Sequence, residues 1–237
     1  MKLQYKKILL KLSGEVFSSK DANFDMKKIK EIAEEISEIV KAGVKVGIVI
    51  GGGNIWRYRD FTDSHIERVT SDTLGMMATL MNSVVLKNAL IACKCKVDIL
   101  STIDVPQLAE KYVPRLAQKY LDEGSVVICA GGTGNPYFTT DSAAALRALE
   151  LQVDAMFKAT NVDFVYTSDP KKNKHAEKLL SISYEDFLEK NLKVLDSTAI
   201  ALCREGKLPV IVFNLEKRGN ILRAIKGEKI GTTIKSV

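Results

Sequence analysis

The chain has 237 residues, of which 46% are hydrophobic and 27% charged, as in an ordinary globular protein rather than a disordered or collagen-like one. The formal net charge of +6 favours anionic partners, but the lysines are scattered and no aromatic-interleaved RNA-binding motif accompanies them, so we expect no nucleic-acid partner. No apolar run approaches the roughly 20 residues of a membrane span, and the N-terminus lacks a signal-peptide cleavage site, so we expect a cytoplasmic protein without a membrane partner.

Apolar segments bounded by glycine alternate with amphipathic stretches along the chain, a pattern typical of a largely parallel sheet covered by helices on both faces. Between the first two strands, apolar residues recur at helical spacing over 29–40, with Asp25 as the expected N-cap and Gly43 as the stop. The predicted strands are 6–12, 44–50, 96–100, 125–130, 153–159, 163–167 and 208–213.

A second predicted helix, over about residues 72–92, is apolar nearly all round. Such a helix is buried on more than one side, either inside the domain or between subunits, and we favour a subunit interface. No proline- or serine-rich linker interrupts the chain, so we expect residues 1–237 to form one continuous domain with an N-terminal and a C-terminal lobe.

Small and polar residues follow four of the predicted strands. Ligands of parallel sheets bind outside the carboxyl ends of the strands, where backbone groups and helix N-termini converge, so we expect one site to be built there. The four segments are KLSGE (11–15), GGGN (51–54), GGTGN (131–135) and SDP (168–170).

Lys11 lies inside the apolar stretch ILLKLSG, so it either meets an anion or carboxylate or points outward to solvent. The glycines of segment 131–134 let the backbone approach a ligand, and Thr139 and Thr140 offer hydroxyls at the N-terminus of a helix that begins near Asp141. Two roles are open for Asp141, and one residue can combine them: it caps that helix, or it holds Lys11 or a magnesium ion.

Two common nucleotide-binding motifs are absent from the sequence, which has neither GxxxxGK[ST] nor a GxGxxG followed by a helix and an acidic residue. The four cysteines include no CxxC pair and only two histidines could join them, so we expect no zinc site. Any phosphate chemistry must use another arrangement.

Six segments, in this order, resemble the bacterial UMP kinases of the amino acid kinase superfamily, and the likeness runs from about Lys6 to Gly231. The segment GTGNPYFTTD is close to diagnostic for these enzymes among their relatives. The six segments are KLSGE (11–15), VIGGGNIWR (49–57), SDTLGMMATLMN (71–82), AGGTGNPYFTTDSAAALRALE (130–150), KATNVDFVYTSDP (158–170) and LKVLDSTA (192–199).

The resemblance implies an α/β fold, a three-layer α/β/α sandwich with a mainly parallel central sheet (the amino acid kinase fold), assembled as a homohexamer. The implied activity is transfer of the γ-phosphoryl group of ATP to UMP, giving UDP and ADP in pyrimidine nucleotide biosynthesis. The N-terminal lobe would bind UMP and the C-terminal lobe ATP. The implied cofactor is Mg²⁺, carried by the ATP phosphates near Asp141 without a direct protein ligand.

By similarity, the site residues fall into three groups. The catalytic residues would be Lys11, Arg57, Asp141 and Asp196. The ATP site would comprise Lys11, Leu12, Ser13, Gly14, Gly53, Arg57, Thr160, Tyr166 and Asp169. UMP would be held by Gly52, Asp72, Thr133, Gly134, Asn135, Pro136, Tyr137, Phe138, Thr139 and Thr140, with Asp72 on the ribose hydroxyls.

The sequence departs from the family pattern at three places. Phe164 and Tyr58 stand where glycine is usual, and residues 16–24 replace a glycine-containing loop associated with GTP activation, so the resemblance does not extend to a response to GTP, which the sequence leaves open. Two alternatives remain: a kinase of the same fold acting on carbamate or an amino acid carboxylate, and a catalytically silent nucleotide binder. GTGNPYFTTD argues against the first, and the four retained catalytic residues argue against the second.

Overall fold

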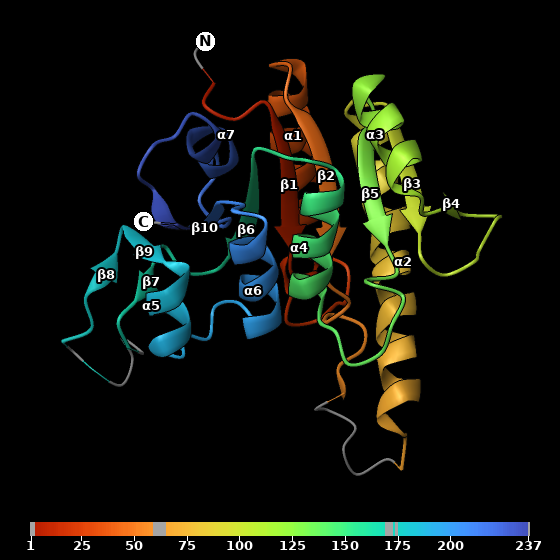
Figure 1. The fold of residues 1–237 in the computed structure, drawn as a ribbon. Coiled ribbons are helices and arrows are strands. Elements are labelled where there is room, and N and C mark those ends of the chain that lie inside the picture. The colour runs from red at the N-terminus through yellow and green to blue at the C-terminus, as the bar shows by residue number, and fades with distance from the viewer. Residues whose placement is uncertain (1–2, 59–64, 169–172, 174, 237) are drawn as a thin grey trace.

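A mainly parallel sheet of nine strands lies between two layers of helices (Figure 1). The structure is a computed structural model that describes residues 3–58, 65–168, 173 and 175–236. In order across the sheet, the strands are β4 (Glu110–Lys111), β3 (Val97–Ser101), β5 (Val126–Ala130), β2 (Lys45–Ile50), β1 (Lys7–Leu12), β6 (Ala155–Thr160), β10 (Val210–Asn214), β11 (Gly231–Lys235) and β9 (Ser181–Ser183). Within the described residues, β10 and β11 form the antiparallel pair of this sheet. The expected three-layer fold is confirmed.

The helices pack on the sheet in two sets. One face carries α1 (Met26–Lys41), α2 (Arg68–Ala92) and α7 (Asn220–Ile225), and the other carries α3 (Pro114–Asp122), α4 (Thr140–Glu150), α5 (Tyr184–Glu189) and α6 (Ser197–Glu205). A short 3₁₀ helix, η1 (Gly14–Phe17), follows β1.

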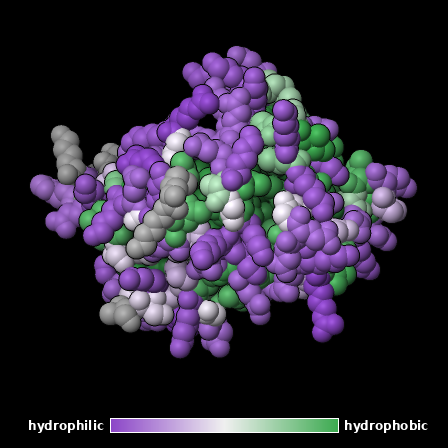
Figure 2. All heavy atoms as spheres, turned by 90° about the horizontal axis from the view of Figure 1, so that it is seen from above, coloured by the Kyte–Doolittle hydropathy of each residue, from purple (hydrophilic) through white to green (hydrophobic). Residues whose placement is uncertain are grey.

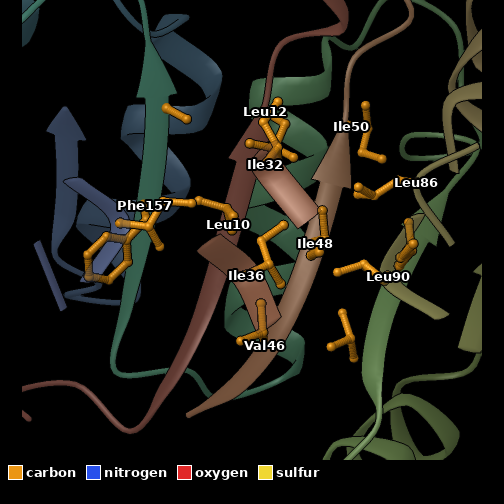
Figure 3. Packing of buried hydrophobic residues seen from close by; sticks show 14 of the residues in the cluster. Leu10, Leu12, Ile32, Ile36, Val46, Ile48, Ile50, Leu86, Leu90 and Phe157 are labelled. Atoms are coloured by element: carbon orange, nitrogen blue, oxygen red, sulfur yellow. The ribbon is translucent and has the colours of Figure 1, made fainter. Parts of the chain in front are cut away.

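Strand β1 shows why both faces of the sheet are buried. Successive side chains of a strand point to opposite faces, so Leu10 and Leu12 pack against α1 and β2 (Figure 3), whereas Leu9 packs in the cluster on the α4 side. Lys11 shares the face of Leu9 and therefore points towards the layer that contains α4.

Helix α1 begins and ends where the sequence predicts. The carboxylate of Asp25 accepts hydrogen bonds from the backbone N–H groups of Lys27 and Lys28, at 3.1 and 3.2 Å. Gly43 follows the helix with φ +91°, the left-handed conformation that commonly terminates helices.

The expected strand over 163–167 is wrong as a member of the main sheet. Only β7 (Val165–Tyr166) is extended there, and it pairs with β8 (Lys178–Leu179) in a separate two-stranded sheet. A short apolar run indicates an extended segment but does not identify its pairing partner. The strands β4, β8, β9 and β11 lie outside the predicted segments, because three of them have only two or three residues and β11 is rich in threonine and lysine.

Helix α2 begins at Arg68, earlier than predicted, and is not buried all round. Leu80, Leu86 and Leu90 pack on the sheet, whereas Met77 and Met81 are each 51% exposed in the single chain. The helix is long and apolar enough to cross a membrane by length and composition, a test that a core helix also passes.

Seen from above, hydrophilic side chains cover most of the surface of the molecule, with hydrophobic residues in the gaps between them (Figure 2).

Candidate active site

Two buried lysines share one carboxylate at the carboxyl ends of β1 and β6. Lys11 and Lys158 are register partners on these adjacent parallel strands. The Nζ atom of Lys11 lies 2.6 Å from Oδ1 of Asp141, and Nζ of Lys158 contacts Oδ2 of the same residue. All three side chains are at most 12% exposed, so Lys11 does not point to solvent.

The charges of this cluster shift two of its pKa values. Burial alone would raise the pKa of Asp141, but the neighbouring ammonium groups of Lys11 and Lys158 outweigh it and hold this pKa below its ordinary value. Burial and the charge of Lys11 lower the pKa of Lys158 to about 8, against the opposing effect of Asp141. Near neutral pH the carboxylate therefore balances one of two cations, and the cluster has an excess positive charge for an anion to neutralise.

Asp141 is free to pair with the lysines because another residue caps its helix. The side chain of Thr139 is the N-cap of α4, and its Oγ1 accepts from the backbone N–H groups of Asp141 and Ser142 at 3.0 and 3.3 Å. The N-cap alternative for Asp141 is therefore wrong. Its place in the first turn still puts a carboxylate at the positive end of the helix dipole.

Asp196 joins α4 to α6. It caps α6 by accepting from the N–H of Ala199 at 2.7 Å, and it also accepts from the hydroxyls of Ser142, at 3.0 Å, and Thr139. With Lys11 and Asp141 it lines a cavity of about 460 Å³. Asp196 thus lies beside the lysine cluster, but its carboxylate is occupied by the two helix N-termini.

The segments that follow β1 and β2 approach each other so closely that position 14 must be glycine. We call this contact between residue 14 and residues 51–54 the glycine crossing. A Cβ atom on Gly14 would lie 2.5 Å from Oδ1 of Asn54 and 2.6 Å from the carbonyl oxygen of Gly51. Arg57 follows this crossing. Its Nη2 lies 2.7 Å from Oε1 of Glu15, and its Nε donates to the carbonyl of Gly53. The guanidinium is therefore held inside the site.

A larger cavity of about 1180 Å³ extends from the lysine cluster across the ends of β1 and β6. It is slightly larger than the roughly 300–1,000 Å³ typical of small-molecule sites and so has room for such a ligand. Among the ATP-site residues suggested by the resemblance, Lys11, Ser13, Arg57, Thr160 and Tyr166 line it, as do Lys158 and Phe164. Leu12, Gly14 and Gly53 are not among the residues that line it, and the side chain of Leu12 is in the core. Asp169 lies outside the described residues.

The segment that follows β5 lies against the start of α2. The backbone N–H of Tyr137 donates to Oδ2 of Asp72 at 2.7 Å, and Nε of Arg68 lies 2.9 Å from both oxygens of that carboxylate. Gly52 packs on the same helix, since a Cβ there would lie 2.7 Å from the carbonyl of Gly75. The structure thereby brings Gly52, Asp72 and segment 133–140 to one place, where Tyr137 and Phe138 are exposed.

A family model for amino acid kinases matches residues 6–214. The chain belongs to the amino acid kinase family. The uridylate kinase of Dichelobacter nodosus (strain VCS1703A) is 48% identical over 234 residues, which cover 98% of this chain and 97% of that protein. Two solved structures are also similar: UMP kinase from Bacillus anthracis (TM-score 0.95, 39% identity, 98% and 96% of the two chains) and UMP kinase from Ureaplasma parvum (TM-score 0.93, 37% identity, 100% of both).

In this amino acid kinase, the sequence pattern missed three residues that the site contains. Lys158 has the same signal as Lys11, a lysine inside an apolar strand. Glu15 and Ser142 are polar residues in loops or first turns, and no local pattern distinguishes such positions from solvated ones. Only the folded chain shows that they contact Arg57 and Asp196.

Proposed function

We propose that this chain is a UMP kinase that transfers the γ-phosphoryl group of ATP to UMP, giving ADP and UDP, in pyrimidine nucleotide biosynthesis. The observation that carries the proposal is the pair of buried lysines on one carboxylate, placed where the two cavities meet. Both cavities are lined by Lys11. Extensive similarity to proteins named uridylate or UMP kinase supports UMP as the acceptor.

In this reaction a phosphate oxygen of UMP attacks the γ-phosphorus of ATP, and the bond from that phosphorus to the bridging oxygen of ADP breaks. The acceptor is already an oxyanion, so no general base is needed, and the difficulty is to bring two polyanions together. Lys11 and Lys158 would stabilise the charge of the transferred group, and Arg57 would bind two phosphate oxygens through its planar fork.

ATP would occupy the larger cavity, in the C-terminal lobe, with its phosphates towards Lys11, Ser13 and Gly14 and its nucleoside near Thr160 and Tyr166. UMP would lie in the N-terminal lobe between the glycine crossing and segment 133–140, with its ribose on Asp72. Hydroxyls and amides in that segment suit uracil, which has both donor and acceptor edges. We propose that the two lobes form one domain over residues 1–237.

Mg²⁺ would accompany ATP. This ion is commonly bound by substrate phosphates, water and only one or two carboxylates, and it stabilises the negative charge of the transferred phosphoryl group when bound. Within the described residues, no three histidines, cysteines or carboxylates are grouped as a metal site. Asp141 and Asp196 line the smaller cavity, but the first is paired with two lysines and the second accepts from two hydroxyls and an N–H, so the ion would be carried by the nucleotide phosphates.

We further propose a cytoplasmic homohexamer. The exposed side of α2 supports self-association, because a single chain leaves the large apolar side chains of Met77, Met81 and Ile91 about half exposed to water.

A coupled ADP-release assay with Mg-ATP and UMP, CMP, AMP, carbamate or glutamate as acceptor tests the function. We expect strong selectivity for UMP, and loss of turnover in Lys11→Ala with UMP still bound. Phosphorylation of carbamate or glutamate instead would favour a different kinase of this fold. ATP binding without turnover of any acceptor would favour a silent nucleotide binder.

A further inference from the structure

Arg147 is a buried arginine on α4 that the proposed chemistry does not use. It is only 4% exposed and lies on a helix whose other buried positions are mainly alanine. A buried guanidinium is costly unless its charge is paired and its donors are satisfied, and a smaller apolar residue would avoid that cost. Its Nε nevertheless finds no hydrogen-bond partner within the described part of the chain.

Two neighbours fix the orientation of this guanidinium. Nη1 of Arg147 donates to the carboxylate of Glu150, three residues further along α4. The guanidinium carbon lies 3.9 Å from the ring centroid of Tyr112, whose hydroxyl donates to the same carboxylate at 2.8 Å. A guanidinium that is both stacked and paired has little rotational freedom.

The third neighbour belongs to the turn of residues 131–134 that follows β5, here called the glycine turn. Helical side chains lean towards the N-terminus, so Arg147 reaches back to this turn, and its Nη2 lies 3.4 Å from the carbonyl oxygen of Gly132. The preceding carbonyl, of Gly131, accepts from Oγ1 of Thr102 at 2.7 Å. The N–H of Gly131 donates to Oγ1 of Thr79 at 2.9 Å. Side chains from three separate segments thus hold three consecutive peptide units, those between residues 130 and 133.

Holding a carbonyl also orients the amide of the same peptide unit. The C=O and N–H of a planar trans peptide point in opposite directions. The N–H groups of Gly132 and Thr133 must therefore point away from Thr102 and Arg147, respectively. Within the described residues neither N–H has an acceptor, and both glycines of the turn have positive φ, +79° and +63°, as in backbone concavities that bind anions.

We propose that Arg147 is a positioning residue for the acceptor nucleotide: by holding the carbonyl of Gly132 towards α4, it keeps the N–H of Thr133 turned to the bound UMP. This inference rests on the proposed function, since it concerns how the acceptor is held. Arg147 acts through the turn and does not itself touch the nucleotide.

The test compares UMP affinity, measured by titration calorimetry without ATP, with the KM values of both substrates in Arg147→Met and Arg147→Lys. We expect UMP binding to weaken about tenfold in Arg147→Met, as for loss of a charged hydrogen bond, with less than about a twofold change in the KM for ATP. Lysine should restore little of the loss, because its ammonium is a point charge that cannot reproduce the planar fork of donors.

Tyr184→Phe is the matched control for lost stability. It removes a buried hydroxyl that donates to the carbonyl of Leu208, between α5 and the segment before β10. We expect it to lower the melting temperature while leaving UMP affinity unchanged. An equal rise in the KM values for UMP and ATP in Arg147→Met would overturn the positioning role. Wild-type UMP affinity in both Arg147 variants would overturn it as well.

Thr102→Val tests the same idea if the Arg147 variants do not fold. It nearly keeps the side-chain volume and removes one of the two donors to the carbonyl of Gly131, leaving the N–H of Gly134. UMP binding should therefore weaken selectively, and unchanged UMP affinity would contradict the inference. A wild-type chain that neither binds nor phosphorylates UMP would instead remove the proposed function. A wild-type chain that does both, beside variants that bind UMP as tightly, would remove only the role of Arg147.

Discussion

Lys11 and Lys158 face each other in register on β1 and β6, and the ammonium group of each contacts the same carboxylate, that of Asp141. The two strands lie side by side at the centre of the sheet, where successive connections lead to opposite edges. Such a switch point leaves a crevice at the carboxyl ends of the strands, which is where ligands of open α/β sheets bind. The cations therefore lie where a phosphate can reach them.

The lowered pKa of Lys158 predicts how activity depends on pH. As pH rises through about 8, Lys158 loses its proton and its charge. The value of kcat/KM for ATP, which reports the free enzyme, should therefore fall above about pH 8. In Lys158→Arg the side chain stays protonated, so this decline should disappear even though the overall rate is lower. An unchanged pH profile in that variant would assign the decline to another group.

The ion pair between Glu15 and Arg57 predicts a competition with ATP. The carboxylate of Glu15 occupies the guanidinium and adds negative charge to the cavity that the phosphates would enter. Glu15→Gln should therefore tighten ATP binding by about twofold to fivefold, the range for a half-exposed pair. Glu31→Gln, on the same cavity wall in α1, is the control and should change ATP affinity less. Weaker binding in Glu15→Gln would show that Glu15 instead orders Arg57.

Comparing substitutions of Gly131 and Gly124 distinguishes the cost of a left-handed backbone from the cost of a steric clash. Both have φ near +80°, but a Cβ on Gly131 would lie 2.4 Å from Oγ1 of Thr102, whereas one on Gly124 would meet nothing within 4 Å. Gly124→Ala should cost about 1–2 kcal/mol of unfolding free energy for the left-handed backbone alone. Gly131→Ala should cost about 1–3 kcal/mol more. Urea denaturation measures both, and similar losses would mean that the turn relaxes around the new methyl group.

Replacing Asp72 should raise the KM for UMP more than the KM for ATP. In Asp72→Asn the amide no longer provides two charged acceptor oxygens for Arg68 and the N–H of Tyr137. We expect the KM for UMP to rise about tenfold and that for ATP by less than about twofold. Asp122→Asn, which removes a surface pair with Lys45, is the control and should leave both unchanged. Parallel increases in both KM values would indicate a general structural effect.

Local patterns in the sequence were sufficient for the elements whose burial is continuous. Strands β1, β2 and β5 are apolar runs buried on both faces, and α1 has a capping aspartate and a terminating glycine, so their signals are local. The pairing of β7 with β8 and the exposed side of α2 could not be predicted, because they depend on which segments meet in space.

The same limit applies to the site. Lys11 and the glycine turns have unusual residues for their positions and could be singled out. The capping role of Thr139, by contrast, depends on side-chain direction within one turn, and a choice between Thr139 and Asp141 is beyond residue preference, since both types cap helices well. The contact of Arg147 with Gly132 depends on the path of the chain before α4.

The register between β1 and β6 also bears on when the site forms during folding. Lys11 and Lys158 are separated by more than half the chain. Strands β1 to β5 all precede β6 in the sequence, so β1 can pair with β6 only after those strands have been synthesised. Contacts between distant segments form slowly, because the intervening chain must first be ordered. A ribosome-bound chain that ends before β6 would therefore contain the glycine turns and Asp141 but no second lysine, and it should be unable to perform phosphoryl transfer.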